Sequence, residues 1–174
     1  MKVIIVGGVA GGATAAARLR RLDETAEIVV FERSGYVSYA NCGLPYYIGG
    51  VITDKEELTL QTPESFWRRF RVDMRVRHEV TAIHPAEKTV DVRNLATGET
   101  FTESYDKLVL SPGARPTQPA LPGVGIDRLF TLRTVEDTLK IQEFIEQHHP
   151  RSAVLAGGGF IGVGEPSGHP YQGH

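Results

Sequence analysis

The sequence predicts an α/β fold in which helices cover a parallel sheet, and the first 42 residues carry most of that prediction. Lys2–Val6 is a short, β-branched apolar run, as expected for a strand buried on both faces. A glycine-rich turn at 7–12 follows directly, and the alanine-rich segment 13–22 is predicted to be a helix. A second strand, Glu27–Phe31, is followed by the acid Glu32. Strand, glycine turn, helix, strand and acid in this order are typical of a dinucleotide-binding βαβ unit.

The glycine turn has the chemistry to hold a pyrophosphate. A helix N-terminus offers unpaired N–H groups and a positive dipole end, and glycine leaves the approach open. Glu32 follows the glycines by about 20 residues, where an acid can accept hydrogen bonds from ribose hydroxyls. Val9 stands at the second glycine position of the strict G-x-G-x-x-G pattern. The alternative is an ordinary turn without a ligand, but the spacing of strands, helix and acid favours binding.

Composition and charge narrow the function classes. The length of 174 residues suits one domain, and the formal net charge of −2 gives no reason to expect nucleic acid or a membrane surface as a partner. No apolar run approaches the ~18 residues of a membrane span. Cys42 is the only cysteine, which fits a reducing compartment, so a cytoplasmic location is expected. His169 and His174 are interpreted as part of a tail, and no metal site is predicted.

Three segments carry a resemblance to a known family, namely VGGVAGGATAAARLRRL, VFER and YVSYANCGLPYYIGG. Together they resemble the flavin-dependent pyridine nucleotide-disulfide oxidoreductases. The chain looks most like the single-cysteine branch, which contains coenzyme A-disulfide reductases, NADH-dependent persulfide and polysulfide reductases, and NADH oxidases. Those enzymes open with a G-x-x-x-G-G turn, so Val9 fits. The resemblance spans residues 1 to about 162, and 40–46 is closer to the disulfide and persulfide reductases than to the water-forming oxidases.

The resemblance implies a Rossmann-like FAD-binding domain at 1–150, incomplete in this chain, with an antiparallel β-meander inserted into its parallel sheet. The meander is expected within 73–106, with 74–77 as its first strand, and Leu108–Leu110 as a buried strand after it. Thr62 and Thr134 are expected to cap helices, the latter over 134–147. Short apolar and turn patterns at these positions agree with that layout.

The C-terminal stretch predicts the start of a second nucleotide-binding unit. Residues 151–163 would supply the first strand, at Ala153–Ala156, and a complete G-x-G-x-x-G turn at 157–162 of an NAD(P)H-binding domain. Residues 164–174 contain two prolines and three glycines, so they are interpreted as a tail and not as the expected helix. Because the family continues with the rest of both domains and a dimerisation domain, we expect a truncated chain that is inactive alone, with homodimers only in the full-length family.

The resemblance also assigns roles to single residues. Cys42 is the implied catalytic residue, because a cysteine close to a helix N-terminus gains thiolate character; a buried, inert cysteine is the alternative. The implied FAD contacts are Gly7, Val9, Ala10, Gly11, Glu32, Arg33, Asn41, Val80, Ser111, Pro112, Gly113 and Arg133. The implied contacts to coenzyme A, a candidate ligand, are Thr14, Arg18, Arg21, Ser38 and Asn41.

The predicted function is NAD(P)H-dependent reduction of a small-molecule disulfide or persulfide through FAD and one redox-active cysteine. The Cys42 thiolate would attack the substrate and form a mixed disulfide. One alternative is an NADH oxidase in which Cys42 cycles through a sulfenic acid. The other is a non-catalytic FAD-binding fragment. These alternatives stay open on sequence alone.

Overall fold

The computed structural model describes residues 1–59, 61–117, 120 and 122–157, and their contacts divide the chain into two compact units. The first unit comprises Met1–Tyr39 and Thr59–Ala114. The second unit comprises Ala40–Leu58 and the chain from Arg115 onward. Residues within 1–150 therefore contribute to both units, and the predicted domain boundaries stay a prediction.

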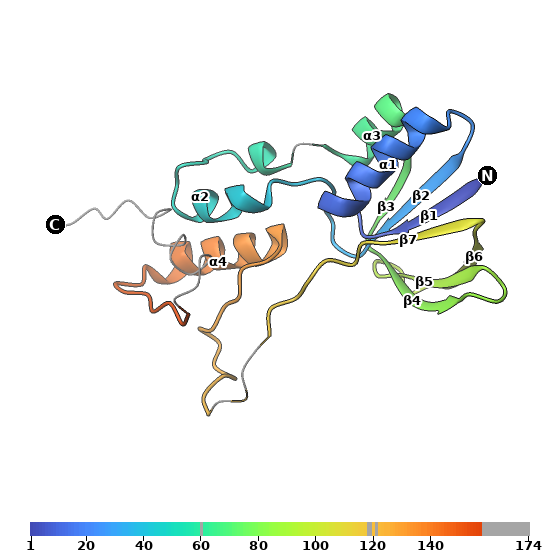
Figure 1. Ribbon diagram of the computed structural model, residues 1–174. Helices are drawn as coiled ribbons and strands as arrows, with labels where there is room; N and C mark the ends of the chain where they lie inside the picture. Colours follow the sequence, from blue (N-terminus) through green and yellow to red (C-terminus); the bar gives the residue numbers. More distant parts are fainter. Residues whose placement is uncertain (60, 118–119, 121, 158–174) are drawn as a thin grey trace. The chain divides into compact units, whose positions relative to one another are not determined.

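A four-stranded parallel sheet organises the first unit (Figure 1). Its strands are β1 (Lys2–Val6), β2 (Glu27–Glu32), β3 (Asp73–Val76) and β7 (Lys107–Leu110), in the order β3-β2-β1-β7. One face packs against α1 (Ala10–Leu22) and α3 (Pro63–Phe70), where the buried cluster includes Val3, Ile5, Ala16, Val30 and Phe66. The apolar residues 3–6 of β1 and 28–31 of β2 face both layers in turn, because neighbouring side chains of a strand point to opposite faces.

An antiparallel sheet covers the other face of the parallel sheet. It consists of β4 (His78–His84), β5 (Thr89–Asn94) and β6 (Thr100–Ser104). Val90 and Val92 of β5 pack in one buried cluster with Ile4, Val29 and Phe31. The first unit therefore has three layers: helices, parallel sheet and antiparallel sheet (Figure 1).

The expected four-stranded meander is wrong in one strand. The segment around 74–77 forms β3, which pairs in parallel with β2 and belongs to the main sheet. The physical reason is the crossover that precedes it, since a helical connection such as α3 returns the chain parallel to its neighbour. Arg77, with φ of 55°, ends this strand before the antiparallel sheet begins.

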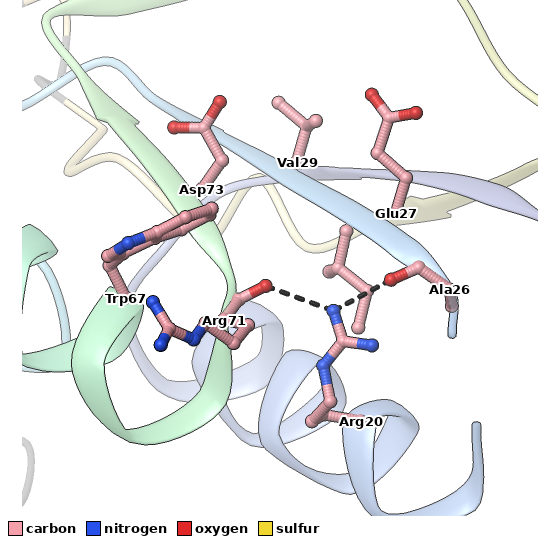
Figure 2. A pocket seen from close by; sticks show the side chains of 8 residues that line it. Arg20, Ala26, Glu27, Val29, Trp67, Arg71 and Asp73 are labelled. Atoms are coloured by element: carbon pink, nitrogen blue, oxygen red, sulfur yellow. Dashed lines mark hydrogen bonds between the residues drawn. The ribbon is translucent and has the colours of Figure 1, made fainter. Parts of the chain in front are cut away.

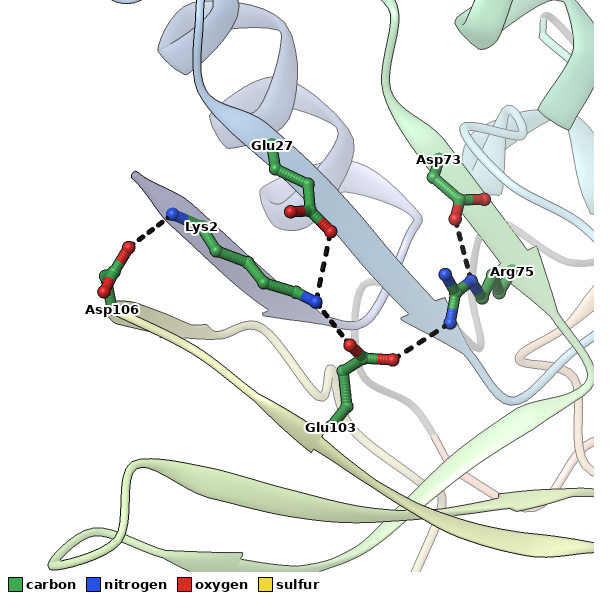
Figure 3. A network of polar contacts seen from close by, with 6 residues as sticks. All are labelled: Lys2, Glu27, Asp73, Arg75, Glu103 and Asp106. Carbon is green, nitrogen blue, oxygen red and sulfur yellow. Dashed lines mark hydrogen bonds and ion pairs between the residues drawn. The ribbon is translucent and has the colours of Figure 1, made fainter.

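A polar network ties β6 to the parallel sheet (Figure 3). Glu103 on β6 contacts the Nζ of Lys2 and lies 3.2 Å from Nη1 of Arg75. Lys2 also pairs with Glu27 at 3.1 Å, and Arg75 with Asp73 at 2.8 Å. The hydrogen bond to Glu103 raises the pKa of Lys2 above its ordinary value. Burial acts to raise the pKa of Glu103, but the bonds from Lys2 and Arg75 outweigh it and lower that pKa.

The second unit contains short helices and one long helix. These are η1 (Asn41–Gly43), α2 (Leu44–Ile48), η2 (Lys55–Leu58) and α4 (Val135–His148). α2 contacts α4, and Figure 1 shows the two side by side.

Both predicted helix caps are confirmed, one in each unit. Thr62 accepts a hydrogen bond from Ser65 N–H, and Thr134 accepts one from Asp137 N–H.

Three further expectations are corrected. α1 begins at Ala10, inside the glycine turn, and not at residue 12 or 13. β7 is an edge strand and not a buried one, so Leu110 is 58% exposed. Ala153–Ala156 forms no strand and Val154 is 94% exposed, because no described strand pairs with this segment. Residues 158–162 of the second glycine turn and the tail at 164–174 lie outside the described residues.

Candidate functional site

The carboxyl ends of β1, β2 and β7 bring together three segments that were predicted to bind FAD. Gly7 N–H donates to Phe31 O at 2.8 Å, and Ser111 N–H donates to Val6 O at 2.8 Å. The glycine turn, the acid after β2 and the turn at 111–113 are therefore neighbours. Ligands of open α/β sheets bind at this edge, outside the carboxyl ends of the strands.

Close backbone packing explains the glycines at 7 and 12. Gly7 has φ of 95°, and a Cβ built on it would lie 2.0 Å from Ser111 O. A Cβ on Gly12 would lie 1.7 Å from Gly7 O. Ala10 and Gly11 are exposed in the first turn of α1, where helix geometry leaves N–H groups without partners inside the helix. This arrangement fits an anionic pyrophosphate.

Glu32 lies at this edge and is only 9% exposed. Its Oε2 accepts from Gly8 N–H at 2.7 Å, and its Oε1 accepts from Ser34 N–H at 2.8 Å. The carboxylate therefore fixes the glycine turn to the end of β2, a role that sequence reasoning missed. Each carboxylate oxygen has a second lone pair, so the group can still accept hydrogen bonds from a ribose.

The remaining candidates of the first unit lie around this edge. Arg33 has an exposed side chain and lies 3.7 Å from Glu79, the neighbour of Val80 on β4. The β4–β5 pairing is irregular between Val80 and Ala82. Pro112 and Gly113 are exposed beyond β7. Ser38 has a left-handed backbone, with φ of 47°, and its N–H donates to Gly8 O at 3.0 Å.

The three candidates on α1 form one exposed stripe. Thr14, Arg18 and Arg21 are spaced four and three residues apart and therefore share a helix face. Arg21 also lines an open hollow of about 660 Å³, whose other lining residues are Arg20, Glu24, Arg69, Phe70 and Arg71. The hollow carries excess positive charge, as an anionic ligand requires.

Arg20 differs from its neighbour Arg21 because its guanidinium is hydrogen-bonded to the backbone of the protein. It donates to the carbonyl oxygens of five residues, at 2.7 to 3.1 Å: Asp23, Glu24, Ala26, Phe70 and Arg71. Figure 2 shows two of these bonds beside a hollow of about 350 Å³ between α1, β2 and α3. Arg20 therefore joins the C-terminal ends of two helices and is not a ligand-binding candidate.

In the second unit, Cys42 lies in η1 and is exposed. The Cys42 side chain is therefore not buried, contrary to the alternative of a buried, inert cysteine. Gly43 N–H donates to Ala40 O at 2.9 Å and closes the turn. Asn41 Oδ1 accepts from Arg133 Nη1 at 3.1 Å, which brings together two candidates that are 92 positions apart. Sequence patterns give no signal for this bond.

Within the described residues, no group of three or more histidine, cysteine, aspartate or glutamate side chains could hold a metal ion. None of the described helices is both long and apolar enough to cross a membrane.

The layered fold, with a glycine turn and an acid at the carboxyl edge of a parallel sheet, is of the Rossmann type. Residues 1–165 match the family described as pyridine nucleotide-disulphide oxidoreductase, and the chain belongs to this family. Enzymes of this family depend on FAD and use NAD(P)H as electron donor.

Three proteins that are similar to this chain have names that specify an activity or an enzyme type. A coenzyme A disulfide reductase of Staphylococcus haemolyticus is 44% identical over 93% of this chain and 36% of its own length. The reduced Bacillus anthracis protein CoADR-RHD has a TM-score of 0.94 and 53% identity, over 96% of this chain and 30% of its own. An NAD-dependent persulfide reductase from A. fulgidus has a TM-score of 0.90 and 34% identity, over 97% and 32%. The chain thus spans about a third of the length of these relatives.

Proposed function

We propose that this chain is part of an enzyme that reduces a disulfide or persulfide of the coenzyme A class, with Cys42 as the catalytic residue. The observation that carries the proposal is the exposed single thiol of Cys42 in a chain that is 44% identical to a coenzyme A disulfide reductase. The persulfide reductase among the similar structures supports the same acceptor chemistry.

The edge of the parallel sheet would hold FAD. The first turn of α1 offers N–H groups to the pyrophosphate, and Glu32 offers carboxylate oxygens to the ribose. Ser111, Pro112 and Gly113 would line the same edge, with Arg33 and Val80 beside it. When bound, FAD supplies two-electron transfer between a nicotinamide and a sulfur. Asn41 and Arg133 are proposed contacts from the second unit.

The proposed role of Cys42 is nucleophilic. Its thiolate attacks a sulfur of the substrate, so that a new S–S bond joins Cys42 to one half of the substrate. The other half leaves as a thiolate from a disulfide, or as hydrosulfide when the inner sulfur of a persulfide is attacked. A two-electron reduction of this mixed disulfide then releases the second thiol and returns the Cys42 thiolate. Because the sulfur is exposed, a bulky disulfide can approach it.

The substrate would bind through its phosphates. We propose that Thr14, Arg18 and Arg21 contact coenzyme A, together with Ser38 and Asn41. Arg69 and Arg71 line the same hollow as Arg21, which supports an anion there. Arginine suits phosphate because its planar guanidinium can donate two parallel hydrogen bonds.

Cys42→Ser in a full-length protein tests the proposal. We expect NADH-dependent reduction of coenzyme A disulfide and of coenzyme A persulfide to fall to background, while the flavin spectrum is retained. Thr53→Ser, at an exposed position of the same unit, is the control and should leave turnover unchanged. Retained disulfide and persulfide reduction in Cys42→Ser would refute the thiol mechanism. Turnover that is faster with oxygen than with either sulfur substrate would instead indicate an NADH oxidase.

A further inference from the structure

A side-chain hydrogen bond joins the Cys42 turn to the residue that precedes the N-cap of α4. Arg133 Nη1 donates to Asn41 Oδ1 at 3.1 Å, and both residues are half-buried. We infer that Arg133 is a positioning residue that acts through Asn41 to fix the turn that carries Cys42. The inference rests on the proposed role of Cys42 and adds to it the residue that sets the geometry of the sulfur.

Arg133 is itself held in place by the capping box of α4. Its backbone N–H donates to Asp137 Oδ2 at 3.1 Å, and Thr134 N–H donates to the same oxygen at 2.9 Å. Asp137 N–H in turn donates to Thr134 Oγ1 at 3.2 Å. Val135 and Thr138 in the first turn of α4 are fully buried. The guanidinium therefore extends from a backbone that is fixed on a regular helix.

The Cys42 turn is also packed against the chain at 52–58. Ala40 N–H donates to Leu58 O at 3.0 Å, and a Cβ on Gly43 would lie 3.4 Å from the side chains of Ile52 and Leu58. The turn is thus bound to this segment through its backbone and to α4 through the Asn41 side chain. Removal of the Arg133–Asn41 bond should let the turn open more often.

Hydrogen exchange at the Gly43 amide reports this opening, because its N–H closes the turn by bonding to Ala40 O. Arg133→Met keeps most of the side-chain stem and removes the donor, whereas Arg133→Lys keeps a donor. NMR of this chain measures the exchange rate of the Gly43 amide. We expect Arg133→Met to increase that rate about fivefold, which is the factor expected when one hydrogen bond is lost. Arg133→Lys should change it less than about twofold, and the β2 amides should not change in either variant.

A double-mutant cycle separates the hydrogen bond from general loosening. Asn41→Leu removes the acceptor and should raise Gly43 exchange as much as Arg133→Met does. In the Asn41→Leu background, Arg133→Met should add no further increase. Arg128→Met, at an exposed arginine of the same unit, is the matched control and should have no effect.

The positioning role is overturned if Arg133→Lys behaves like Arg133→Met, if the two substitutions multiply their effects, or if Gly43 exchange does not respond. These outcomes concern the shape of the turn and involve no turnover. They leave the Cys42→Ser test untouched, and a failure of Cys42→Ser would in turn leave the exchange result standing.

Discussion

At the scale of single residues, His84 and Asp91 on the antiparallel sheet form an ion pair whose strength depends on pH. His84 Nε2 lies 2.8 Å from Asp91 Oδ2, and Thr102 Oγ1 donates to Asp91 Oδ1 at 2.8 Å. The hydrogen bond to Asp91 raises the pKa of His84 above 6.5. Bonds from His84 and then from Thr102 lower the pKa of Asp91 below 3.8.

The sign of the pH effect follows from these directions. The contribution of His84 is complete below its ordinary pKa and is lost as the pH rises through its raised value. The contribution of Asp91 is complete above its ordinary pKa and is lost as the pH falls through its lowered value. We therefore expect Asp91→Asn to lower the pH at which His84 titrates, followed by NMR of the imidazole. His149→Gln should leave that titration unchanged, and an unshifted His84 in Asp91→Asn would contradict the pairing.

At the scale of elements, the turn between β1 and α1 depends on the absence of a side chain at residue 12. A Cβ there would lie 1.7 Å from the backbone oxygen of Gly7, which cannot move without disturbing β1. Gly12→Ala should therefore lower the free energy of unfolding by about 1–3 kcal/mol, although alanine is the better helix former. Urea denaturation measures the change.

Gly125→Ala is the control for this substitution, because open space surrounds Gly125. Its effect should stay within about 0.5 kcal/mol. A Gly12→Ala variant as stable as the parent chain would show that α1 can shift away from β1, and would disprove the close approach as the reason for the glycine.

Elements that depend on local chemistry could be predicted from the sequence, and elements that depend on distant partners could not. Thr62 and Thr134 are predictable as caps because each threonine directly precedes a helical pattern, with Pro63 at the first helical position after Thr62. The strand at 73–76 was assigned to the wrong sheet, because its pattern does not say which neighbour it pairs with. Likewise, the apolar run of β7 does not reveal that the strand lies at a sheet edge.

At the scale of the whole molecule, the same distinction applies to the site. The glycine turn, Glu32 and Ser111 were expected at one site because of the family resemblance, and their meeting is explained by parallel strands whose carboxyl ends share one edge. By contrast, the hydrogen bonds from Arg133 to Asn41 and from Arg20 to Phe70 O join positions that are far apart in the sequence. Their proximity depends on tertiary packing. Residue types and spacing alone contain no such information.

The two units also differ in how much apolar surface they bury. Both large buried clusters belong to the first unit, where the strands β1, β2 and β5 supply most of the side chains. Among the described residues of the second unit, the buried hydrophobic side chains are Leu44, Leu58 and Val135. Because protection against local opening grows with buried apolar contacts, the second unit should open at a lower free energy than the first.

Hydrogen exchange across the chain tests this difference. Amides of β1 and β2 should exchange at least about 100-fold more slowly than those of α2 and α4, since helix packing with few buried side chains allows local opening. Val92→Ala, in the core of the first unit, should speed exchange in the sheets and leave α4 unchanged. Leu58→Ala should have the opposite pattern, because its side chain is buried beside the Cys42 turn. Equal protection of α4 and β2 would mean that the two units open together, and the easier opening expected for the Cys42 turn would then have no basis in its packing.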